Sequence, residues 1–147
     1  MENCADKKFM KEAIKEAKKA YKKDEVPVGA VVVHNGKILG RGHNQVERRE
    51  SVVAHAEIMA IISATKKLGD WRLTGCSLYV TVEPCFMCFG AIMLSRISRL
   101  VYGTSEPEFG FINRVTKLPE GLEITSGLMG NKCRNLLGRF FKRLRQK

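Results

Sequence analysis

Two short segments of this sequence carry side chains that bind metals and move protons. One reads His-Ala-Glu and begins at His55, and the other reads Pro-Cys-Phe-Met-Cys and ends at Cys88. One imidazole nitrogen and two thiolates form a donor set that suits Zn²⁺. Three protein ligands leave the fourth tetrahedral position for water, which distinguishes a catalytic zinc from a closed structural one. We therefore expect His55, Cys85 and Cys88 to hold one Zn²⁺ per chain. Glu57, two residues from His55, is the candidate catalytic proton carrier.

Each half of this pattern has another interpretation when it stands alone. A Cys-x-x-Cys pair that follows a strand and begins a helix is also typical of a dithiol redox site. It can also form half of a structural zinc site, for which Cys76 or Cys133 would supply the fourth ligand. A histidine at a helix start is more often a structural residue than a ligand. The occurrence of both halves, each where a helix is expected to begin, favours the catalytic metal site.

Length and composition indicate one globular domain that comprises residues 1–147. The chain has 147 residues, of which 44% are hydrophobic, and this is enough for one core. The first residues are polar and charged and lack the apolar core of a signal peptide. No apolar run approaches the ~20 residues that span a bilayer. Five cysteines, two of them assigned to the metal, do not suggest a disulfide framework. We expect a cytoplasmic protein with no membrane association.

The charge is strongly positive and unevenly distributed. Lys and Arg total 26 against 15 Asp and Glu, which gives a net charge of +11. No acidic residue follows Glu123, and the basic residues beyond it are Lys132, Arg134, Arg139, Lys142, Arg143, Arg145 and Lys147. A surface of one sign favours a polyanionic partner such as RNA, although a solvated helix surface has the same composition. Lys142, Arg143 and Arg145 are the candidate RNA contacts.

Hydrophobic periodicity predicts alternating helices and strands. Helices are expected over residues 7–23, 54–67, 84–95 and 131–145. Strands are expected over residues 28–34, 37–42, 78–82, 99–102 and, with a weaker signal, 122–125. Asn35-Gly36 predicts a two-residue hairpin turn, because both of its positions need positive φ. The polar residues 45–51 are expected to form a loop.

These elements place the candidate metal ligands at helix starts. His55 and Glu57 fall in the first turn of their helix. Pro84 suits the first helical position, where no backbone N–H is needed, and Cys85 and Cys88 then share one face of that turn. The strand–helix–strand unit implies a parallel pair with a right-handed crossover. The element order predicts an α/β fold, in three α/β/α layers with a central mixed five-stranded sheet.

At these residues the sequence resembles the cytidine and deoxycytidylate deaminase superfamily and, within it, the bacterial tRNA adenosine deaminases. The likeness runs from about Glu25 to the C-terminus. It is strongest in EVPVGA from Glu25, AHAEIMA from Ala54 and YVTVEPC from Tyr79, and the basic ending FFKRLR is also similar. The resemblance implies a cytidine-deaminase-like fold. It also implies a homodimeric, zinc-dependent hydrolase that converts the wobble adenosine of a tRNA anticodon loop to inosine.

The resemblance also implies roles for individual residues around the zinc. Asn44 is expected to hydrogen-bond the flipped base, Val28 to pack on its face, and Ala56 to contribute a backbone group at the pocket floor. A deaminase of a free base or nucleoside, of the guanine or cytosine type, stays as the alternative because it shares the zinc residues. The basic C-terminal helix favours RNA over such a small neutral substrate.

The sequence departs from the family pattern after the fourth predicted strand. Bacterial relatives often carry an Asp, a Lys and small residues there, whereas residues 105–112 read Ser-Glu-Pro-Glu-Phe-Gly-Phe-Ile. Glu106 is the candidate replacement for the acid. This loop is expected near the RNA, so the departure concerns the fine contacts with the substrate.

Overall fold

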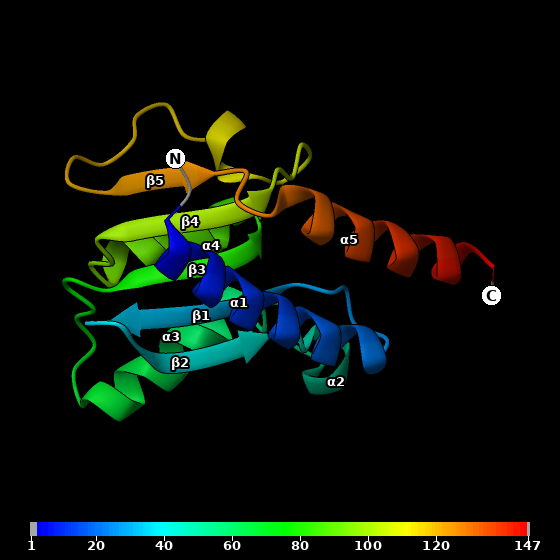
Figure 1. Cartoon of the computed structure of the whole chain (residues 1–147), viewed down its shortest axis with the longest axis horizontal. Helices are drawn as coiled ribbons and strands as arrows, with labels where there is room; N and C mark the ends of the chain where they lie inside the picture. The colour runs from blue at the N-terminus through cyan, green and yellow to red at the C-terminus, as the bar shows by residue number, and fades with distance from the viewer. Residues whose placement is uncertain (1–2, 147) are drawn as a thin grey trace.

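The computed structural model describes residues 3–146, which form a five-stranded mixed sheet between two layers of helices (Figure 1). The strands are β1 (Gly29–His34), β2 (Lys37–His43), β3 (Ser77–Val82), β4 (Arg99–Thr104) and β5 (Glu123–Ser126). Their order in the sheet is β2-β1-β3-β4-β5. β1 is antiparallel to both of its neighbours, whereas β3, β4 and β5 are parallel. The predicted three-layer α/β fold and the parallel crossover are confirmed.

Helices cover both faces of the sheet. They are α1 (Cys4–Lys22), α2 (Val46–Arg49), α3 (Ala56–Leu68), α4 (Phe86–Leu94) and α5 (Gly130–Arg145), with a 3₁₀ turn η1 at Phe111–Asn113. α1 and α5 pack on one face, and α3 and α4 on the other (Figure 1). Within residues 3–146, no helix combines the length and the apolar character that crossing a membrane requires.

α3 packs unusually close to the sheet because both surfaces consist of small residues. Its inner face presents Ala56, Ala60 and Ala64, all fully buried. In β2, Gly40 and Gly42 face this helix, and a Cβ at Gly42 would lie 2.3 Å from the Ala56 carbonyl oxygen. Any side chain at these glycines would therefore push α3 outward. The close packing fixes the N-terminus of α3, where the candidate ligand His55 lies.

Both helices that carry candidate ligands begin later than the sequence predicts. α3 begins at Ala56, and His55 is its N-cap residue with an extended backbone (φ −77°, ψ 154°). α4 begins at Phe86, and Cys85 is its N-cap residue. The prediction that Pro84 occupies the first helical position is wrong. The Pro84 carbonyl oxygen accepts a hydrogen bond from the Phe111 N–H (3.0 Å), and this contact holds the segment before α4 in an extended conformation.

The loop predicted over residues 45–51 contains the short helix α2. Its N-cap residue, Gln45, makes no side-chain capping bond. The buried carboxylate of Glu25 accepts hydrogen bonds from the N–H groups of Glu47 (3.0 Å) and Arg48 (2.8 Å) instead. A carboxylate from a distant part of the chain therefore satisfies the free donors of this helix.

Candidate metal centre and substrate pocket

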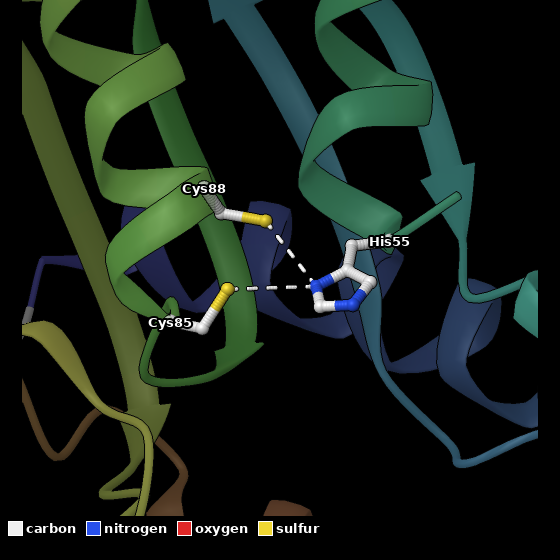
Figure 2. Close-up of side chains that lie close together, drawn as sticks. All are labelled: His55, Cys85 and Cys88. Carbon is white, nitrogen blue, oxygen red and sulfur yellow. Dashed lines mark hydrogen bonds between the residues drawn. The ribbon is translucent and has the colours of Figure 1, made fainter. Parts of the chain in front are cut away.

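The three candidate ligands converge between the N-termini of α3 and α4 (Figure 2). His55 Nδ1 lies 3.6 Å from Cys85 Sγ and 3.4 Å from Cys88 Sγ. The three ligand atoms all lie within 4.8 Å of one another. Cys85 comes from the N-cap of α4 and Cys88 from its first turn, so the extended entry into the helix brings both sulfurs to the same side.

This geometry fits a tetrahedral zinc site. With Zn–S bonds of about 2.3 Å and Zn–N bonds of about 2.0–2.1 Å, a tetrahedral zinc separates an imidazole nitrogen from a thiolate sulfur by about 3.6 Å. The two N···S distances here match that separation. In the part of the chain that the structure describes, this metal-ligand cluster contains no fourth cysteine, and Cys76 and Cys133 are buried elsewhere. The arrangement is that of a zinc site with one open position, not of a closed structural site.

The electrostatics of the cluster favour a thiolate at Cys85. A hydrogen bond from the Cys88 thiol and the neighbouring His55 together lower the pKa of Cys85 to about 4. The same contact with Cys85 raises the pKa of His55. The Cys88 thiol, hydrogen-bonded to Cys85 and buried, has a raised pKa. A bound Zn²⁺ changes this balance, because a coordinating thiol is deprotonated outright.

Glu57 lies beside the cluster without belonging to it. Its side chain is 3% exposed, and burial raises the pKa of its carboxyl group to about 7. A cation bound at the neighbouring ligands acts in the opposite direction and favours the carboxylate. Glu57 is therefore a carboxyl group that can hold or release a proton next to the open position of the metal site.

A cavity of about 630 Å³ opens above the cluster and Glu57. Val28, Asn44 and Ala56 line it together with the ligands His55 and Cys85. The other walls come from residues 105–109 after β4 and from one side of α5. The structure thus brings all three predicted base-contacting residues into one pocket with Glu57. Their contact with a base stays a prediction.

The side-chain amide of Asn44 is held in one orientation. Its Nδ2 donates to the Val26 carbonyl oxygen (3.2 Å), and its Oδ1 accepts from the Val46 N–H (3.1 Å). Each of these amide atoms can make one further hydrogen bond. Asn44 therefore has one N–H and one lone pair with which to contact a base in the pocket.

Glu83 fastens the loop after β4, a role that sequence reasoning missed. Its carboxylate is 3% exposed and accepts hydrogen bonds from the N–H groups of Glu106 and Ile112, each at 3.0 Å. Phe111 in the same loop stacks on Phe89 of α4 with ring centroids 4.1 Å apart. The pocket wall is thus anchored to the strand and helix that flank Cys85. The only sequence signal for this role is the position of Glu83 directly before Pro-Cys.

The three predicted RNA contacts have different surroundings in α5. Arg143 donates to Asp24 (2.9 Å) and to the Tyr21 carbonyl oxygen (3.0 Å), and its guanidinium lies 4.1 Å from the centre of the Tyr21 ring. It joins α5 to the end of α1. Lys142 lines a groove between α1 and α5, and Arg145 is exposed near the end of the helix. Their contact with RNA stays a prediction.

Comparison with known proteins places these features in a family. Residues 4–104 match the cytidine and deoxycytidylate deaminase zinc-binding region. The chain is 47% identical to the tRNA-specific adenosine deaminase of Bacillus subtilis over 97% of its own length and 92% of that protein. A solved structure from a study of A-to-I editing by tRNA:A34 deaminases superposes with a TM-score of 0.82 at 39% identity, covering 88% of this chain and 98% of that one.

A structure of a guanine deaminase from Nitrosomonas europaea is also similar, with a TM-score of 0.80 at 26% identity, and the alignment covers 91% of this chain and 83% of that one. The fold is therefore common to deaminases of different bases, and the sequence is more similar to the tRNA enzymes. With a matching zinc-binding region and a His-Cys-Cys cluster of zinc geometry, this chain belongs to the cytidine and deoxycytidylate deaminase family.

Proposed function

We propose that this protein is a zinc-dependent tRNA adenosine deaminase that converts adenosine to inosine at the wobble position of anticodon loops. The observation that carries the proposal is the pocket itself. Glu57 and the ligands His55 and Cys85 line it, and α5, a helix with six basic residues and no acidic one, forms one of its walls. The 47% identity to a tRNA-specific adenosine deaminase over nearly the whole chain supports the same substrate.

The chemistry divides between the metal and Glu57. Zinc held by His55, Cys85 and Cys88 supplies a Lewis acid that lowers the pKa of a water molecule. Glu57 takes a proton from the water that adds to C6 of adenine and delivers it to the ring nitrogen. Glu57 then takes the second proton from the hydroxyl group at C6 and passes it to the departing amine, so that the C6=O bond forms, ammonia leaves and inosine remains. Because its carboxyl is buried beside the ligands, it is positioned for both transfers.

The base-binding roles follow from the pocket walls. Val28 packs on the face of the flipped base, and Asn44 uses its remaining N–H and lone pair on the edge of the base. Ala56 contributes its backbone beside the metal. Since Arg143 is bound to Asp24, we propose that it positions α5, while Lys142 and Arg145 carry the contacts with phosphates.

The test is inosine formation in a defined tRNA. Unmodified tRNA with adenosine at the wobble position is incubated with the zinc-loaded protein, and nucleosides are quantified after digestion. We expect inosine with the wild type and very little with Glu57→Gln. Free guanine is assayed in parallel for conversion to xanthine, because guanine deaminases share this fold. Guanine turnover without inosine in tRNA would replace the proposal with the free-base alternative.

We further propose that the chain, as one deaminase domain, forms a homodimer through α4. This helix contains no charged residue, yet Phe86, Met93 and Leu94 are 54%, 38% and 76% exposed. A helix that is apolar on all sides is ordinarily covered, and a second copy of the chain covers it here. The exposed Val52 and Val53 lie just before His55 in sequence. With tRNA as the substrate, we expect the dimer to act in the cytoplasm.

Light scattering after size exclusion tests the dimer. The wild type is expected at twice the 16.5 kDa of the chain, and Leu94→Arg at the mass of one chain. The matched control is Leu118→Arg, since Leu118 is also exposed (41%) but lies in the loop before β5. A monomeric wild type at micromolar concentration would contradict the dimer.

A further inference from the structure

A second depression lies on the side of α5 that faces α1. It is a groove of about 800 Å³ lined by Lys18 of α1 and by Lys132, Arg134, Arg139 and Lys142 of α5, with the rest of its lining neutral. Among residues 3–146, none of the side chains that line this groove is acidic. Five cations that converge from two helices without a counter-charge repel one another. Such a groove is stabilised when a polyanion occupies it.

This groove adjoins the catalytic pocket. Arg134 and Gly138 line both the groove and the pocket, so the two depressions adjoin at these residues of α5. Gly138 is exposed in the middle of a helix of sixteen residues. A glycine there lowers helix stability relative to alanine. Apart from its chain neighbours and the backbone of α5 itself, no atom lies within 4 Å of a Cβ built at this position, so packing within the chain does not require a glycine.

We propose that the RNA backbone passes over α5 at Gly138 and continues along this groove, which we call the α1–α5 groove. The inference rests on the proposed tRNA substrate and adds a path for its backbone outside the pocket. Lys18, Lys132, Arg139 and Lys142 contact phosphates there. The missing side chain at Gly138 lets the backbone approach the helix closely, a common use of glycine beside a ligand. Lys18 lies in α1, outside the basic C-terminal segment, and the proposed path makes it a contact for the RNA backbone.

The decisive experiment removes two cations of the groove, one from α1 and one from α5. Lys18→Gln/Lys132→Gln is compared with Lys37→Gln/Lys117→Gln, which removes the same charge from exposed positions at the start of β2 and in the loop before β5. Affinity for full-length tRNA is measured over a range of salt concentrations. If each groove lysine neutralises one phosphate, the slope of log affinity against log salt falls by roughly 1.4–1.8 in the groove variant only. Equal slopes in the two double variants would overturn the groove.

Gly138 gives a second, independent measurement. Gly138→Ala and Gly138→Leu are both expected to raise the melting temperature, because the helix gains a better helix former. Gly138→Leu is also expected to bind tRNA more weakly than Gly138→Ala, since its side chain occupies the crossing point. Equal affinity of the two variants would refute the crossing. If the wild type forms no inosine in tRNA, the proposed reaction is wrong. The salt dependence of tRNA binding tests the groove separately, because it does not require the reaction.

Discussion

Glu83→Gln tests whether a buried carboxylate, and not the metal ligands alone, sets the shape of the pocket. The two oxygens of Glu83 accept from the N–H groups of Glu106 and Ile112, each at 3.0 Å. A glutamine of the same size keeps one accepting oxygen and turns an NH₂ group toward the other N–H. One backbone donor of the loop then loses its partner in a buried position.

The expected cost follows from this geometry. A hydrogen bond to a charged group contributes about 1.5–3 kcal/mol, and a buried donor left without a partner costs a similar amount. We therefore expect the free energy of unfolding to fall by about 2 kcal/mol. The loop of residues 105–109 lines the pocket, so kcat/KM for tRNA falls as well. The zinc content is expected to stay at about one per chain, because no ligand is changed.

Urea unfolding measures the free energy of unfolding. Hydrogen exchange of the amides in residues 105–112 shows whether the stability is lost in this loop. Glu120→Gln is the matched control, since it makes the same charge change at an exposed residue in the loop before β5. We expect faster exchange in residues 105–112 in Glu83→Gln only. If the unfolding free energies of the two variants agree within about 0.5 kcal/mol, Glu83 does not fasten this loop.

The other predictions concern the metal, the proton carrier and acid stability. Cys88→Ala is expected to lose zinc together with activity, and tightly bound zinc in that variant would show that the ligands are assigned wrongly. Glu57→Gln is expected to fold and keep zinc while its rate drops by ~10²–10⁴, and a rate within a few-fold of wild type would remove it from the mechanism. Hydrogen bonds from Arg99 lower the pKa of Asp6, which is also bonded to Tyr79. Its stabilising effect is therefore full above about pH 4 and is lost as the pH falls through the lower folded-state pKa. Acid unfolding of Asp6→Asn is expected to depend less on pH than that of wild type, and equal pH dependence would contradict this.

Patterns that are local in sequence were sufficient for the sheet and for the metal ligands. Asn35 and Gly36 both adopt the positive φ that the hairpin turn needs (50° and 76°), and the strands on either side pair as predicted. His55, Cys85 and Cys88 meet because each lies at the start of a helix that packs on the same face of the sheet. Short-range spacing in the sequence was therefore sufficient to predict the hairpin and the three metal ligands.

What the sequence did not predict depends on contacts between distant segments. The helix α2 forms because Glu25, about twenty residues earlier, satisfies its N-terminal donors. α4 begins later than expected because Phe111 bonds to the Pro84 carbonyl oxygen. Periodicity and capping rules consider only the segment to which they are applied. They cannot identify these partners, because the partners lie outside residues 45–51 and 84–95. The errors in helix boundaries thus arise where the pocket walls are joined to the rest of the fold.

Glu57 and Glu83 line the pocket, and Glu25 directly precedes Val26, which also lines it. The contacts of these three buried glutamates suggest different tasks. Glu25 and Glu83 are 2% and 3% exposed, and each accepts two backbone N–H groups from a segment that flanks the pocket. These bonds tie each carboxylate to the backbone of that segment. Glu57 is equally buried, but it faces the metal ligands, and burial raises its pKa to about 7. A carboxylate that accepts two backbone N–H groups acts as an anchor, whereas a proton carrier must lie beside the reacting atoms. Glu57 has its carboxyl group against the metal ligands, where a proton carrier is needed.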